Sequence, residues 1–141
     1  MVKLDSGGNY LWARTFGGRG PDAATDVAVD DTGDLFVIGT FRVTADFDPG
    51  DGVDLHTQLG LIDDIFLTKL HADGSYGWTH TWPAVFRDDN GRFTLDSEGN
   101  VLLTGGFDGL VDFDPGPGVD FHESPQGVEC PFVMKIHGDG T

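Results

Sequence analysis

The sequence predicts an all-β fold in which four-stranded antiparallel sheets form the blades of a β-propeller. Three observations predict it: the chain repeats itself every 66 residues, apolar residues follow strand patterns, and the turns between them end in glycine. Residues 46–54, DFDPGDGVD, return as residues 112–120, DFDPGPGVD, with one change. The remainder of each repeat aligns at the same offset without a gap.

Each repeat contains four predicted strands. Residues 25–30 (TDVAVD) alternate polar and apolar side chains, which is typical of a half-buried strand, and residues 35–41 (LFVIGTF) form a short apolar run. Residues 64–70 and 76–82 supply the third and fourth strands. The joining turns carry an acid or a histidine and then glycine, which adopts positive φ without strain. No segment keeps a helical period of useful length.

We therefore expect one propeller segment over residues 1–141, with repeat 1 at 1–66, repeat 2 at 67–132 and the start of repeat 3 at 133–141. Two blades and part of a third cannot close a ring, because propellers have about four to eight blades. Further repeats or other copies of the chain would complete it. The chain starts and ends at a third strand, which favours an excised segment or terminal strands that complete a blade with a neighbour.

Composition argues against several partners. The chain has 24 acidic and 8 basic residues and a formal charge of −16, which disfavours nucleic acid and anionic membrane surfaces. No apolar run is long enough to cross a bilayer. Residues 1–8 lack the apolar segment of a signal peptide, so the signal of a secreted parent protein would lie outside this chain. Cys130 is the single cysteine, and we expect it to be inert.

The order and spacing of three motifs carry a resemblance to a known family. DIFLTKLHADGSYGWTHTW, DVAVDDTGDLFVIGTF and DFDPGDGVD resemble the repeats of the bacterial β-propeller family often labelled SBBP. The resemblance covers nearly the whole chain and departs from the pattern at residues 83–87 and 129–131. It implies large bacterial proteins that are secreted or exposed on the cell surface, and it implies no defined enzyme activity.

Each repeat owes its surplus length to the segment between its second and third strands, which is residues 42–63 in the first repeat. The nonapeptides 46–54 and 112–120 lie in these segments, and we call them the acidic loops. Each loop has acids at positions 1, 3 and 9, and glycine at position 7 would let a carbonyl turn inward. These residues are Asp46, Asp48, Gly52 and Asp54 in the first loop, and Asp112, Asp114, Gly118 and Asp120 in the second.

This spacing predicts a calcium site in each acidic loop, because Ca²⁺ takes about six to eight oxygen ligands from carboxylates and carbonyls. It is similar to the D-x-D-x-D-G-x-x-D loops of integrin α-chain propellers, although position 5 here is glycine. The alternative is a turn without an ion. Asp-Pro-Gly is a strong turn signal, and alternation alone would place Asp46 and Asp48 outside and Phe47 inside. A turn does not require Asp54 or Asp120, so both interpretations stay open.

Other candidate sites are weaker. The histidines lie at turns and loop edges, where packing explains them more simply than a metal does; they are His56, His71, His80, His122 and His137. No acid departs from the repeat pattern in a way that marks an active site, so we expect no catalytic residue and no organic cofactor. Trp12, Trp78 and the phenylalanines are expected to pack between blades.

The sequence thus predicts a non-enzymatic, extracellular structural or adhesive repeat segment. Its expected partners are further propeller repeats, copies of itself, or a glycan or protein of the cell surface. One alternative is a carbohydrate-binding or carbohydrate-cleaving propeller, which an exposed shelf of aromatic residues would favour. Another is a self-assembling fibre or lattice subunit, which strand pairing between copies would favour.

Overall fold

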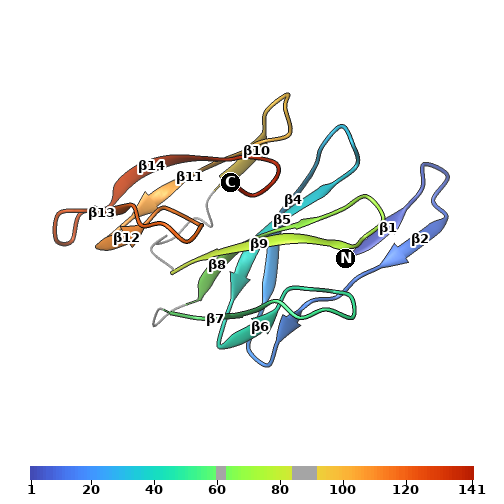
Figure 1. The fold of residues 1–141 in the computed structure, drawn as a ribbon, viewed down its shortest axis with the longest axis horizontal. Coiled ribbons are helices and arrows are strands. Elements are labelled where there is room, and N and C mark those ends of the chain that lie inside the picture. The colour runs from blue at the N-terminus through green and yellow to red at the C-terminus, as the bar shows by residue number, and fades with distance from the viewer. Residues whose placement is uncertain (60–62, 84–91) are drawn as a thin grey trace.

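A computed structural model describes residues 1–59, 63–83 and 92–141 of the chain (Figure 1). These residues form antiparallel strands and turns without a helix, which confirms the predicted all-β class, and none of them belongs to a helix that could span a membrane. The strands are β1 (Val2–Leu4), β2 (Tyr10–Ala13), β3 (Gly17–Gly18), β4 (Ala23–Val29), β5 (Leu35–Phe41), β6 (Thr44–Asp46), β7 (Leu55–Thr57), β8 (Asp64–Leu70), β9 (Tyr76–Trp82), β10 (Arg92–Leu95), β11 (Val101–Phe107), β12 (Leu110–Asp112), β13 (Phe121–Glu123) and β14 (Cys130–Ile136).

A four-stranded antiparallel sheet in the order β4-β5-β8-β9 begins in repeat 1 and ends in the first strands of repeat 2. Strands β5, β8 and β9 have the predicted bounds, and β4 is shifted slightly towards the N-terminus of its predicted range. The two central strands, β5 and β8, are buried at all but one of their residues. Burial on both faces explains why their sequences are nearly continuous apolar runs rather than alternating ones.

The segment between β5 and β8 forms strands of its own, which the sequence analysis did not predict. Strands β6 and β7 pair as a hairpin, and β3 adds to β6 to complete a small three-stranded sheet. The acidic loop 46–54 is the connection between β6 and β7. In the second repeat, β12 and β13 form the matching hairpin around the acidic loop 112–120.

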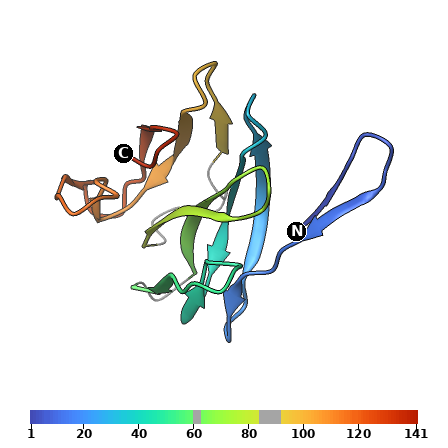
Figure 2. The ribbon, with the colours of Figure 1, turned by 45° about the vertical axis from the view of Figure 1, so that its right-hand side comes forward.

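A three-stranded sheet in the order β10-β11-β14 begins in repeat 2 and ends at the start of repeat 3. Its register repeats that of the first sheet, since Leu35 pairs with Leu70 and Val101 pairs with Ile136. Figures 1 and 2 show the β1–β2 hairpin, the four-stranded sheet and the three-stranded sheet side by side in chain order. Part of the departure from the family pattern at residues 83–87 lies outside the described residues.

Two apolar clusters cover the two faces of the four-stranded sheet. The larger joins it to the three-stranded sheet and contains Phe36, Ile38, Ile65, Leu67, Trp82, Val101, Leu103 and Ile136. The smaller lies on the opposite face and contains Val37, Phe41, Ala45, Phe47 and Phe66, with Phe16 and Tyr76 packed against it. The first acidic loop is therefore attached to a buried framework through Phe47.

Candidate functional site

The first acidic loop is closed by its own backbone and by the carboxylate at position 1. The Phe47 amide donates to the Asp54 carbonyl at 3.0 Å, which extends the β6–β7 hairpin into the loop. One oxygen of Asp46 accepts two backbone amides, from Asp48 at 3.1 Å and from Asp54 at 2.9 Å. Asp46 thus ties the start of the loop to its end.

The carboxylate at position 3 explains the glycine at position 7. Asp48 Oδ1 accepts the Gly50 amide at 2.8 Å, and a Cβ built on Gly52 would lie 2.1 Å from Asp48 Oδ2. No side chain fits there without displacing the carboxylate. The sequence analysis assigned this glycine to turning a carbonyl inward, whereas the structure assigns it to the close approach of an acid.

The second acidic loop repeats these contacts. Asp112 Oδ1 accepts the amides of Asp114 at 3.1 Å and Asp120 at 2.8 Å, and Asp114 Oδ1 accepts the Gly116 amide at 2.7 Å. A Cβ on Gly118 would lie 1.9 Å from Asp114 Oδ2. The near-identity of the two nonapeptides therefore corresponds to one set of backbone and carboxylate bonds made twice.

The acid at position 9 has a partner that the sequence analysis did not assign to it. His56 Nε2 donates to Asp54 Oδ2 at 3.0 Å, and the hydroxyl of Tyr76 donates to the same oxygen. The other ring nitrogen of His56 lies 3.0 Å from Thr81 Oγ1 on β9. Burial, and next the hydrogen bond to Asp54, raise the pKa of Tyr76, so its hydroxyl stays protonated and donates.

Asp120, the acid at position 9 of the second acidic loop, makes the corresponding contact, but its side chain is more exposed than that of Asp54. His122 Nε2 lies 3.2 Å from Asp120 Oδ1, and both side chains are more than half exposed. The first loop is thus fastened through Asp54 to the four-stranded sheet, and the second through Asp120 to the histidine two residues later. In both loops the acid that a turn alone does not need has a protein partner.

The three acids of each loop do not converge on one centre. Within residues 1–59, 63–83 and 92–141, no three histidine, cysteine or acidic side chains form a group that could hold a metal ion. Positions 1 and 3 bind amides of their own loop, and position 9 faces a histidine. This arrangement matches the turn without an ion, and the calcium site stays a prediction.

The turn interpretation predicts that the melting temperature of the chain is the same in excess EDTA and in millimolar calcium. Substituting Asp46→Ala should lower the free energy of unfolding by about 1–3 kcal/mol in either solution. The reason is that the partly buried backbone amides of Asp48 and Asp54 lose their acceptor. Asp46→Asn, which keeps an acceptor oxygen, should cost less. A midpoint that rises with calcium in the native chain and not in Asp46→Asn would establish the ion site instead.

A second set of contacts joins the β1–β2 hairpin to the next sheet along the chain. Lys3 Nζ donates to the Ala72 carbonyl at 2.7 Å, and Trp12 Nε1 donates to the same carbonyl at 3.3 Å. Arg14 Nε donates to the Gly74 carbonyl at 2.8 Å. Ala72 and Gly74 belong to the turn between β8 and β9. We call this set the first joint.

The same contacts recur 66 residues later and form the second joint. Lys69 Nζ and Trp78 Nε1 donate to the Gly138 carbonyl at 2.9 Å and 3.3 Å. His80, which occupies the position of Arg14, donates through Nε2 to the Gly140 carbonyl at 2.8 Å. A lysine, a tryptophan and a third cationic or imidazole group therefore bind one hairpin turn of the following repeat in both joints.

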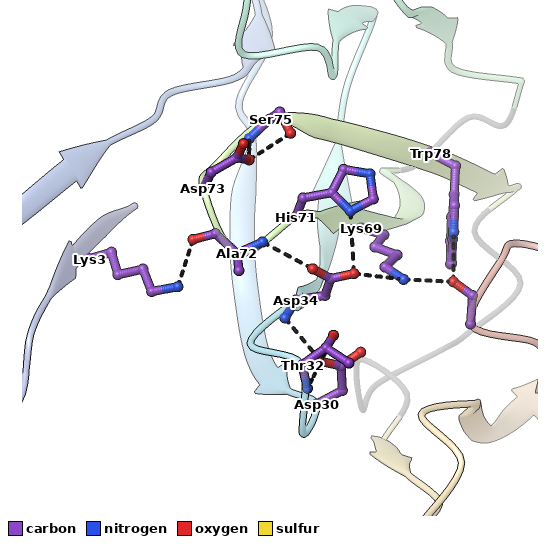
Figure 3. A network of polar contacts seen from close by, with 11 residues as sticks. Lys3, Asp30, Thr32, Asp34, Lys69, His71, Ala72, Asp73, Ser75 and Trp78 are labelled. Carbon is purple, nitrogen blue, oxygen red and sulfur yellow. Dashed lines mark hydrogen bonds and ion pairs between the residues drawn. The ribbon is translucent and has the colours of Figure 1, made fainter.

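Lys69 also links its joint to the turn of its own repeat (Figure 3). Its ammonium lies 3.0 Å from Asp34 Oδ2, and Asp34 Oδ1 accepts the Ala72 amide at 3.0 Å. Burial raises the pKa of Asp34, but hydrogen bonds from Lys69 and His71 outweigh it and hold that pKa below its ordinary value. The ionised Asp34 thus binds the amide of Ala72, and the carbonyl of the same residue accepts hydrogen bonds from Lys3 and Trp12.

His80 brings the second acidic loop into contact with the second joint. Its imidazole interacts with the carbonyl of Pro115, a residue of that loop, as well as with the Gly140 carbonyl. Burial lowers the pKa of His80, so the folded protein binds fewer protons there than the unfolded chain does. This contribution therefore disfavours the folded state as the pH falls below the ordinary histidine range.

Sequence reasoning placed Trp12 and Trp78 between repeats but missed the joints as polar sites. The acceptors are backbone carbonyls, at Ala72 and Gly138 among others. Every residue has such a carbonyl, so the residue type does not show which ones accept a hydrogen bond. The available signal was the recurrence of lysine at positions 3 and 69 together with tryptophan at 12 and 78.

No model of a known protein family matches the chain. Among curated proteins, it is similar to an uncharacterized WD repeat-containing protein, L264, of Acanthamoeba polyphaga mimivirus, with 27% identity over 69% of this chain. The chain spans about 8% of the length of that relative. No solved structure matches the chain.

Proposed function

We propose that the chain is a structural segment of a β-propeller, in which 66-residue repeats pack in series through equivalent joints. The observation that carries the proposal is the recurrence of the joint: lysine and tryptophan donate to the carbonyl of Ala72 in one and of Gly138 in the other. When one interface is repeated at a fixed offset, each repeat is related to the next by the same rotation. A ring of four-stranded sheets is a closed form of such a series.

Two further observations support this proposal. The complete repeat has the four antiparallel strands of a propeller blade, in the order β4-β5-β8-β9. The similar mimiviral protein is named as a WD repeat protein, and WD repeats of about 40–45 residues each form one four-stranded blade. The extra length of the present repeat is accounted for by the hairpin that carries the acidic loop.

In this proposal the acidic loops brace the repeats rather than bind substrate. Phe47 in the first loop is 1% exposed and belongs to the apolar cluster of its sheet, while Pro115 in the second loop meets His80 of the preceding sheet. The buried ring attaches the first loop to its sheet, and the backbone contact attaches the second loop to the sheet before it. Both contacts would stiffen the scaffold. Placement of this scaffold outside the cell, and an adhesive role there, are proposals that come from the resemblance to bacterial surface repeats.

Tandem chains with increasing numbers of the 66-residue repeat would test this proposal by small-angle X-ray scattering. A propeller predicts that the maximum dimension stops growing once the ring closes, at about four to eight repeats. An open superhelix of the same repeats would instead lengthen with every repeat added. Continued linear growth beyond that range would overturn the propeller proposal.

A further inference from the structure

The hairpin that carries the first acidic loop ends in an edge strand, β7. Hydrogen-bonded residue pairs alternate with non-bonded pairs along an antiparallel hairpin, and the bond from the Phe47 amide to the Asp54 carbonyl fixes this alternation. Leu55 and Thr57 therefore direct their backbone amides and carbonyls away from β6, towards the open side of β7. No hydrogen bond joins these groups to another residue of the part of the chain that the structure describes.

The second acidic loop ends in an edge strand of the same kind, β13. The Phe113 amide donates to the Asp120 carbonyl at 3.0 Å, which sets the alternation of the first hairpin again. Phe121 and Glu123 thus direct their backbone groups towards the open side of β13. An open edge is a ready template for the pairing of a further strand.

Each open edge also exposes apolar side chains at equivalent positions. Leu55 and Phe121 are 62% and 59% exposed, and the valines two residues earlier, Val53 and Val119, are still more exposed. Leu55 is exposed although the three-stranded sheet follows its own sheet, and Phe121 is exposed although the four-stranded sheet precedes its own. Neither the following nor the preceding sheet of a series therefore covers this edge.

The charge around both edges is negative. Because side chains alternate along a strand, the acid at position 9 of each loop points to the face opposite that of the apolar residue after it. The side chains of these acids, Asp54 and Asp120, are 33% and 66% exposed. The lysine and arginine ion pairs of the described residues all involve acids outside the acidic loops. Pairing between two such edges would place acid against acid, which disfavours a second copy of the chain as the partner.

We propose that the open edges of β7 and β13 each bind an extended, basic segment of a partner polypeptide by strand addition. The segment that fits alternates apolar side chains with lysine or arginine. Its backbone pairs with the outward amides and carbonyls of the edge, as in other complexes formed by strand addition. Its apolar side chains contact Leu55 or Phe121 on one face, and its cations approach Asp54 or Asp120 on the other.

This binding role goes beyond the structural function and does not depend on the closure of a ring. It gives a use to the hairpin that makes each repeat longer than an ordinary blade. An edge of three residues offers few hydrogen bonds, so binding to one edge would be weak. A partner with several basic segments would gain affinity from the recurrence of the edge in every repeat.

Fluorescence anisotropy with a labelled hexapeptide of alternating lysine and valine, blocked at both ends, tests the proposal. We expect saturable binding, with one peptide on each edge. Three comparison peptides each remove one part of the recognition: glutamate in place of lysine, serine in place of valine, and N-methylated backbone amides. Each should bind more weakly by about tenfold or more, because strand addition needs all three parts.

A pair of charge-matched variants locates the binding site. Leu55→Lys combined with Phe121→Lys should weaken binding of the lysine–valine peptide by about tenfold or more, because it replaces the apolar contact by like charge. Leu11→Lys combined with Val133→Lys makes the same change in net charge at exposed positions of β2 and β14, and it should bind as the native chain does. All four residues are more than half exposed, so both variants should fold, which circular dichroism would verify.

The absence of binding by the lysine–valine peptide would overturn the inference. Undiminished binding of the N-methylated or the serine peptide would also overturn it, since attraction between opposite charges alone would then account for the affinity. Equal losses in the two double variants would show that the edges are not the site. None of these results bears on whether tandem repeats close into a ring, so this inference fails independently of the propeller proposal.

Discussion

Replacing Phe47 by alanine is expected to lower the free energy of unfolding by about 3–5 kcal/mol. The ring is 1% exposed, and its centroid lies 4.9 Å from that of Phe66 and 5.3 Å from that of Phe41. Phe16 and His56 complete the contacts around it. Loss of the ring would open a cavity where the acidic loop, the four-stranded sheet and the N-terminal segment meet.

Chemical denaturation monitored by circular dichroism measures the effect of Phe47→Ala. Phe121→Ala is the control, since that ring is 59% exposed on the β12–β13 hairpin and should change stability by less than about 0.5 kcal/mol. Equal losses for the two variants would contradict the assignment of the acidic loop to the apolar framework. A loss confined to Phe47→Ala would identify the loop as part of the core.

Gly74→Ala is expected to destabilise the chain by about 1–3 kcal/mol more than Gly99→Ala does. Both glycines end equivalent hairpin turns and have positive φ, +81° and +76°, so both substitutions carry the strain of a left-handed backbone, about 1–2 kcal/mol. A Cβ on Gly74 would lie 3.1 Å from the Trp12 ring and from Arg14 Nε. A Cβ on Gly99 would meet nothing closer than 3.5 Å, at Asp30.

The comparison of these two variants isolates the first joint, because backbone strain cancels between them. The additional loss at Gly74 measures how firmly Trp12 is held against the turn of the next repeat. Combining Gly74→Ala with Trp12→Leu should remove most of that additional loss, since the smaller side chain leaves room for the methyl group. Identical losses for Gly74→Ala and Gly99→Ala would contradict the joint.

The main sheet could be predicted from the sequence because its signals are long and local. Strands β5, β8 and β9 each extend over seven residues with apolar or alternating patterns, and glycine marks each hairpin turn. Strands β6 and β7 have three residues each, which is too short for a period to be recognised. Their pairing depends on the acidic loop that connects them, and this loop was considered as a ligand site or as a turn, without the short strands that it joins.

The turn interpretation of the acidic loop agrees with the observed hydrogen bonds. Which groups of the loop bond to one another, however, depends on three-dimensional contacts. Nothing in the residue types indicates that Asp46 binds the amide of Asp54, or that Asp48 occupies the space beside Gly52. The pairing of Asp54 with His56 could have been suspected, because both recur together as Asp120 and His122. The same recurrence argument, applied to lysine and tryptophan, identifies the joints.

Nuclear Overhauser effects between tryptophan and glycine protons test most directly the central claim that consecutive repeats pack through one repeated joint. The positions of Gly74 and Gly140 against the rings of Trp12 and Trp78 predict contacts from each indole to the glycine of the following repeat. They also predict that the Hα protons of both glycines are shifted upfield by the ring current. Glycine Hα protons at ordinary chemical shifts, without contacts to either indole, would contradict the account.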